Sequence, residues 1–198
     1  YAATLTNDNA RKEAIYKKTV ELYPNDFRAY NNLGMMAYAN GDLATAENYF
    51  KQAASKNANA AEVNTNLGLI ELTKGNVANA ETYLSKSTGA NTANEALGNL
   101  YIKQGQYDRA VQAFGDTKTN SAALAQILAK DYNKAKSTLS AVKNPDAYTN
   151  YLMAVVGART NNADLVKSSM DKVNQQDAAL AAKAQNDREF AKYANEVK

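Results

Sequence analysis

Three consecutive stretches of this sequence carry the same pattern of small, aromatic and aliphatic residues. Each has a Leu-Gly pair, a second Gly seven residues later, and an Ala five residues after that second Gly. The interval from Gly34 to Gly68 is 34 residues, and the interval from Gly68 to Gly98 is 30. Self-similarity at such a period is typical of arrays in which one supersecondary unit is stacked on the next. We therefore expect a stack of similar units rather than a fold built around one central core.

Each repeated stretch has the spacing of two amphipathic helices joined by a tight turn. In the first stretch, the apolar residues of the first helix recur every three or four positions at Tyr30, Leu33, Ala37 and Tyr38. Those of the second helix are Leu43, Ala46, Phe50 and Ala53. Gly41 lies between the two runs, where a left-handed residue ends a helix at little cost.

A Gly also recurs inside the first helix of each stretch, at Gly34, Gly68 and Gly98. Gly costs about 1 kcal/mol relative to Ala in a helix interior. We expect its missing side chain to let the second helix approach closely. The recurring alanines of that second helix should do the same from the other side: Ala46, Ala80 and Ala110.

This pattern resembles the tetratricopeptide repeat (TPR). The first stretch matches the family's spacing at Tyr30, Leu33, Gly34, Gly41, Asp42, Ala46, Phe50 and Ala53, and Pro24 fits the closing proline of a partial unit before it. The second stretch departs at Asn64, where the family has an aromatic residue, and at Ser87, where it has Ala. The resemblance implies an all-α fold, a right-handed α-solenoid of helical hairpins that ends in a C-terminal capping helix region.

On this reading residues 1–198 form a single solenoid domain of about ten to twelve helices. The second unit is about one helical turn short near residues 87–90, and the unit at 119–145 has a shortened first helix and no Gly at its turn. A terminal unit must cover the last apolar face of the stack. The expected parts are an N-terminal helix or half repeat at 8–23, clear repeats at 27–60, 61–90 and 91–118, degenerate repeats at 119–145 and 146–176, and a cap at 177–197.

Composition excludes several kinds of chemistry. The chain has no Cys and no His, so thiol nucleophiles, imidazole bases and the usual zinc ligands are absent. No phosphate-binding glycine motif or calcium-loop spacing occurs. We therefore expect no catalytic residue, no metal site and no cofactor. A net charge of +3 is far from the basic stripe of a nucleic-acid binder, and no apolar run is long enough to cross a membrane.

The resemblance also implies which residues line the inner, concave face, because the first helix of each TPR pair faces it. They are Arg28, Asn31, Asn32, Met35, Glu62, Thr65, Asn66, Leu69, Thr92, Glu95, Asn99 and Lys103. The cations with which some TPR proteins clamp a terminal carboxylate are missing from the matching positions. Asn32 and Asn66 share one repeat position, and their amides could pair with a peptide backbone. The alternative is that these asparagines reflect only an Asn-rich composition, and Ala96 at the third position favours that alternative.

The predicted function is a non-catalytic scaffold that binds a peptide or protein segment on the concave face. The alternative is a docking or sensing domain of a longer protein whose activity lies elsewhere. The chain begins at Tyr1 without a visible signal peptide, which suggests a mature form or a fragment, and further domains are possible.

The segments at 10–18, 23–26, 155–160 and 186–193 together resemble the TPR region of envelope-associated proteins of Gram-negative gut bacteria. That resemblance implies a periplasmic or outer-membrane-associated location, with the cytoplasm as the alternative.

Overall fold

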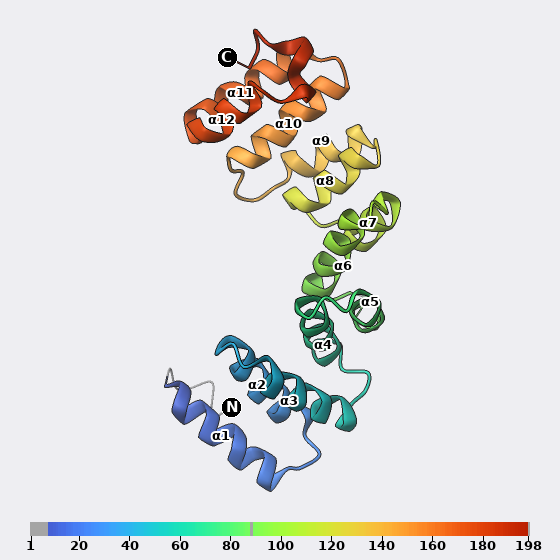
Figure 1. Ribbon diagram of the computed structural model, residues 1–198, viewed down its shortest axis with the longest axis vertical. Coiled ribbons are helices and arrows are strands. Elements are labelled where there is room, and N and C mark those ends of the chain that lie inside the picture. The colour runs from blue at the N-terminus through green and yellow to red at the C-terminus, as the bar shows by residue number, and fades with distance from the viewer. Residues whose placement is uncertain (1–7, 88, 198) are drawn as a thin grey trace. The chain divides into compact units, whose positions relative to one another are not determined.

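The computed structural model describes residues 8–87 and 89–197, and these fold entirely into helices and turns (Figure 1). The predicted all-α fold of helical hairpins is confirmed. The α-helices are α1 (Asn9–Leu22), α2 (Phe27–Ala39), α3 (Leu43–Lys56), α4 (Ala61–Thr73), α5 (Val77–Ser85), α6 (Asn91–Lys103), α7 (Tyr107–Phe114), α8 (Asn120–Leu128), α9 (Tyr132–Ser140), α10 (Ala147–Arg159), α11 (Ala163–Gln176) and α12 (Ala178–Ala184), and a 3₁₀ helix, η2, spans Arg188–Tyr193.

The chain divides into two compact units, one ending at Ala96 and the other starting at Leu97, so the division falls within α6. In the first unit α2 pairs with α3 and α4 with α5, while α1 packs on α2 and α3 on α4. In the second unit α8 pairs with α9 and α10 with α11, and α7 packs on α8. The grouping of the hairpins into one domain with the predicted repeat boundaries stays a prediction.

Helix lengths follow the irregularities of the repeat. Helix α5 has nine residues where α3 has fourteen, in agreement with the turn expected to be missing near residues 87–90, of which Thr88 lies outside the described residues. Helix α8 also has nine residues, whereas α2, α4 and α6 have thirteen each. The shortened first helix of the fourth hairpin is thus confirmed.

Five turns between paired helices share one hydrogen-bond pattern. The N–H group that follows the left-handed residue donates to the carbonyl five residues earlier, as from Asp42 to Ala37 at 2.9 Å and from Asn162 to Gly157 at 2.8 Å. This is the Schellman motif. The left-handed residue is Gly in the first three turns but Lys130 and Asn161 in the last two, at φ 64° and 54°. The last two hairpins therefore keep the turn without its usual residue.

The glycines inside the helices mark the contact between paired helices. A Cβ atom on Gly34 would lie 2.6 Å from the ring of Phe50, and one on Gly98 would lie 2.5 Å from the ring of Phe114. The predicted reason for these glycines, close approach of the second helix, is confirmed. Gly157 plays a related part, because a Cβ there would lie 2.9 Å from the backbone nitrogen of Val166, the residue that corresponds to Ala46 of the first hairpin.

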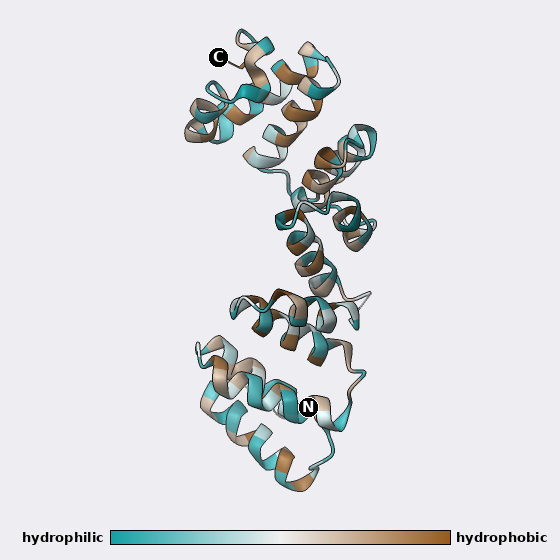
Figure 2. Ribbon diagram, turned by 45° about the vertical axis from the view of Figure 1, so that its right-hand side comes forward, coloured by the Kyte–Doolittle hydropathy of each residue, from teal (hydrophilic) through white to brown (hydrophobic). Residues whose placement is uncertain are grey.

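Apolar side chains fill the spaces within each hairpin and between neighbouring hairpins of the same unit. Figure 2 shows that hydrophobic and hydrophilic residues alternate along the helices, as expected for amphipathic helices. The core of the first unit is centred on Phe50, Val63 and Ile70, and that of the second on Val156, Val166 and Met170. No helix in the described part of the chain is both long enough and apolar enough to span a membrane.

The C-terminal residues cover α10 and α11. Helix α12 packs on α11 and η2 packs on α10. Phe190 and Val197 are each only 1% exposed and belong to the core of the second unit. These described residues thus cover apolar surface of the last hairpin, and the bounds of the cap, 177–197, stay a prediction.

Candidate functional site

Helix α2 carries the first four residues predicted to line the inner face. The helix begins after Asp26, whose carboxylate accepts a hydrogen bond from the N–H group of Arg28 at 3.1 Å. The Arg28 guanidinium also donates to both oxygens of Asp26, at 2.9 and 2.8 Å, and this pairing lowers the pKa of the Asp26 carboxyl. The Arg28 side chain is therefore exposed, but its guanidinium is already paired with Asp26 at the start of α2.

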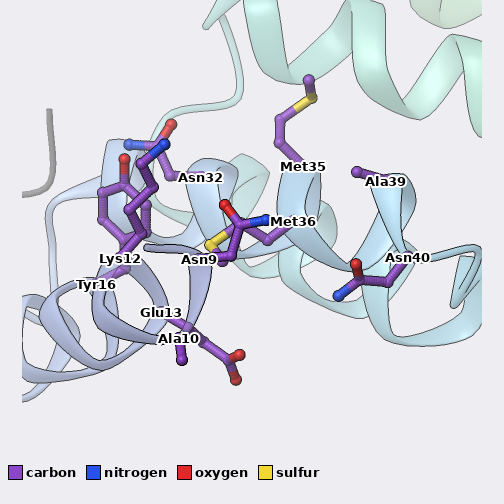
Figure 3. Close-up of a pocket in the computed structure, with 10 residues that line it drawn as sticks. All are labelled: Asn9, Ala10, Lys12, Glu13, Tyr16, Asn32, Met35, Met36, Ala39 and Asn40. Carbon is purple, nitrogen blue, oxygen red and sulfur yellow. The ribbon is translucent and has the colours of Figure 1, made fainter. Parts of the chain in front are cut away.

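Asn32 and Met35, one helical turn apart on α2, line a pocket of about 430 Å³ between α1 and α2. The complete lining is Asn9, Ala10, Lys12, Glu13, Tyr16, Asn32, Met35, Met36, Ala39 and Asn40. Figure 3 shows the polar ends of Lys12, Tyr16 and Asn32 gathered at one end of this pocket, while the carboxylate of Glu13 points away from them.

The pocket lining carries one cation, Lys12, and one anion, Glu13. Glu13 forms an ion pair with Lys17 at 2.6 Å, one turn further along α1, which raises the pKa of the Lys17 ammonium. The ion pairs formed by Glu13 and by the other described residues of α1 do not involve Lys12. The pocket therefore combines a cation, a phenol and an amide with the thioethers of Met35 and Met36, groups suited to a ligand with both apolar and polar parts.

A second set of predicted residues meets between α2 and α4. The amide of Asn66 donates to the Asn31 side-chain oxygen at 2.9 Å. Met35, Asn66 and Leu69 also line a narrow apolar cavity of about 40 Å³ together with Tyr38 and Phe50. Met35 thus lies at both the larger pocket and this cavity, and it is 45% exposed. The structure pairs Asn66 with Asn31 rather than with Asn32, the residue at its own repeat position.

The remaining predicted residues are more scattered. Thr65 is buried, and its hydroxyl donates to the backbone carbonyl of Ala61 at 2.8 Å. Glu62 and Thr92 are exposed, and Glu95 is half-buried. Asn99 and Lys103 are exposed and belong to the second unit.

Sequence reasoning missed the contribution of α1. Its pocket residues recur at helical spacing, at Asn9, Lys12, Glu13 and Tyr16. That spacing was visible in the sequence, but the segment was treated as an isolated helix or half a repeat. Asking which face of α1 covers α2 would have pointed to these residues. Within the described residues no group of three or more Asp and Glu side chains could hold a metal ion.

Comparison with known proteins supports the repeat. Three family models match the chain at residues 15–48, 36–95 and 94–118, and all three describe tetratricopeptide repeats. No curated protein sequence matches the chain.

Several solved structures share the fold. One is YrrB, described as a TPR protein with an unusual peptide-binding site, with 19% identity, a TM-score of 0.64 and coverage of 91% of this chain and 97% of that one. A TPR protein from Parabacteroides merdae has 17% identity and a TM-score of 0.60, covering 94% and 81%. PilW, a type IV pilus biogenesis factor, has 19% identity and a TM-score of 0.58, covering 95% and 90%. Residues 15–118, just over half of the chain, therefore consist of tetratricopeptide repeats, the family to which this protein belongs.

Proposed function

We propose that this protein is a non-catalytic scaffold that binds an extended peptide or protein segment on the inner face of its first unit, starting at the pocket between α1 and α2. The observation that carries this proposal is that Asn32 and Met35, selected by repeat position alone, line that pocket beside Lys12 and Tyr16. YrrB, a TPR protein of similar fold, is described as having a peptide-binding site, which gives the proposal a precedent.

The chemistry of the pocket fits a peptide better than a small polar molecule. Met35 and Met36 offer flexible, polarisable surface to an apolar side chain. The Asn32 amide offers one donor group and one acceptor, so it can pair with a peptide backbone whatever its sequence. The Asn31–Asn66 hydrogen bond fixes α4 beside α2 and so holds the open face in shape.

The test is selection of peptides on the chain, followed by titration. Random displayed peptides are selected on immobilised residues 1–198, and the enriched sequences are synthesised with a fluorophore and titrated by anisotropy. We expect Met35→Glu to raise Kd by about tenfold, because it places a charge in the apolar part of the pocket. Asn32→Ala should raise Kd by a similar factor, because it removes the hydrogen-bond partner of the peptide backbone.

Asn133→Ala is the matched control, because Asn133 is an exposed helical Asn in the second unit. It should leave Kd and the melting temperature unchanged. Enriched peptides whose Kd is the same for the wild type, Met35→Glu and Asn32→Ala would place binding elsewhere and contradict the proposal. A selection that enriches nothing on a folded chain would favour docking onto other domains of a longer protein.

We further propose a location in the periplasm or at the outer membrane. Support comes from the resemblance to envelope-associated TPR regions and from PilW, a pilus biogenesis factor of similar fold. Fractionation of cells that express the tagged natural gene is the test. Recovery of the tag with cytoplasmic markers alone would overturn this location.

A further inference from the structure

The face of α10 corresponds, residue for residue, to the face of α2 just described. Asp42 and Asn162 hold the same place in their turns, since each N–H group donates to the carbonyl five residues before it. With that register, Asn31, Met35 and Ala39 of α2 correspond to the residues Tyr151, Val155 and Arg159 of α10. Tyr151 and Val155 therefore occupy positions that the TPR resemblance assigns to the inner face, and Arg159 lies one turn further along the same face of α10.

On α10 those positions are already occupied by the chain's own C-terminal segment. The Tyr151 hydroxyl donates to the carboxylate of Asp187, and the rings of Tyr151 and Phe190 pack edge to face, with an interplanar angle of 85° and centroids 5.7 Å apart. The Arg159 guanidinium holds both oxygens of Glu189, at 2.5 and 2.7 Å. Figure 1 shows this segment, at the red end of the colour scale, beside α10.

These contacts between α10 and the C-terminal segment are specific for a short sequence pattern in that segment. A carboxylate meets a phenol, a second carboxylate two residues later meets a guanidinium, and the aromatic residue that follows fills an apolar site. Asp187 also accepts a hydrogen bond from the N–H group of Glu189 at 2.9 Å, so the segment organises its own turn. A cap that served only to cover apolar surface would not need two carboxylates matched to Tyr151 and Arg159.

We propose that the α10 face formed by Tyr151, Val155 and Arg159 is a peptide-recognition site for the pattern Asp-x-Glu-aromatic, with residues 187–193 as its resident ligand. A partner protein that carries the same pattern on an exposed segment binds by displacing this tail. The partner must bring an aromatic side chain, because Phe190 is 1% exposed and its site is left empty when the tail departs. The ionic contact is accessible, since the Arg159 side chain is 51% exposed. This site lies within the second unit and does not depend on the pocket between α1 and α2.

The test uses the full chain and a fluorescein-labelled synthetic peptide of residues 185–197. Phe190→Ala removes the aromatic anchor of the resident tail and leaves Tyr151 and Arg159 intact. We expect this variant to bind the peptide saturably, with an affinity at least about tenfold above that of the wild type, whose site is filled. A scrambled peptide of the same composition should not bind.

Charge reversal identifies the site. Adding Arg159→Glu to the Phe190→Ala chain should abolish binding of the natural peptide, and a peptide with Glu189→Arg should restore it. If Phe190→Ala fails to fold by circular dichroism, Glu189→Gln in the full chain takes its place, because it loosens the ionic contact without emptying the core. A folded variant that binds neither peptide, or that binds the scrambled one equally well, would overturn the proposal.

Discussion

Close contact between a helical Gly and a large apolar residue holds each of the first three hairpins together. Gly34 faces Phe50, and in the fourth hairpin the same two positions hold Ala123 and Leu139, both buried. In the second hairpin Gly68 faces Leu84, so a small residue on one helix is matched in each case by a larger one on its partner. This pairing keeps protein interiors close-packed when single residues vary.

Gly34→Ala should therefore destabilise the protein, although Ala is the better helix former by about 1 kcal/mol. The new Cβ atom would lie 2.6 Å from the buried Phe50 ring, and overpacking of this kind costs about 1–3 kcal/mol. Phe50→Leu in the Gly34→Ala background should recover part of the loss, because it recreates the Ala123–Leu139 pair. Urea unfolding of the two single variants and the double variant gives the coupling energy. Purely additive effects would refute the contact.

Helical hairpins in this chain depend on one left-handed residue per turn. Three turns place Gly there, whereas Lys130 adopts φ 64° in the fourth. The surrounding hydrogen bonds hold Lys130 in place, since its N–H group donates to Ile127 at 3.0 Å and that of Asp131 donates to Gln126 at 2.8 Å. The turn between α8 and α9 therefore holds Lys130 in a left-handed conformation that a residue with a side chain disfavours.

Lys130→Gly should stabilise the protein by about 1 kcal/mol, because relief of left-handed strain exceeds the added freedom of the unfolded chain. The expected rise in melting temperature is about 2–4 °C. Ala129→Gly is the matched control, since Ala129 has φ −77° and gains nothing from Gly. That control should lower the melting temperature. If both substitutions lowered the melting temperature, the backbone of Lys130 would not be strained.

At the scale of the whole molecule, both units contain carboxylates that the folded state keeps ionised. In the first unit, the Glu71 side chain is only 8% exposed and pairs with Lys74 at 3.0 Å, and hydrogen bonds from Asn76 and Asn79 complete its partners. These contacts, that with Lys74 foremost, lower the pKa of the Glu71 carboxyl. In the second unit, hydrogen bonds from Thr149 lower the pKa of Asp146 at the start of α10.

These lowered pKa values make stability depend on pH in one direction. A carboxyl whose folded pKa lies below its unfolded value stabilises the protein above the unfolded pKa, which is near 4.5 for Glu and 3.8 for Asp. That stabilisation is lost as the pH falls through the lower, folded pKa. We expect the urea midpoint to stay level from about pH 7 to pH 5 and to fall below that range.

Glu71→Gln tests how much Glu71 of the first unit contributes to the pH dependence of stability. The variant should be less stable than the wild type at neutral pH, because the ion pair with Lys74 is lost. It should also lose less stability on acidification, since one titrating group has gone. Equal acid sensitivity of the variant and the wild type would show that Glu71 does not contribute.

The helices and their pairing could be predicted largely from local signals. Gly41 marked a turn, and three- to four-residue spacing marked the buried faces. The turn at Lys130 carried no such signal, and the structure keeps it through contacts elsewhere in the hairpin. The candidate site was predicted less completely. Asn32 and Met35 followed from repeat position, but the α1 side of their pocket did not.

Local signals in the sequence establish that this chain folds into helical hairpins of the TPR type, because periodic burial and left-handed turns act within one hairpin and depend on residues close together in the chain. Which side chains meet across hairpins became clear from the fold alone: Asn66 with Asn31, the pocket between α1 and α2, and the tail on Tyr151 and Arg159. This is because periodicity specifies only which face of a helix is buried. The partner of that face depends on the packing of segments far apart in the sequence.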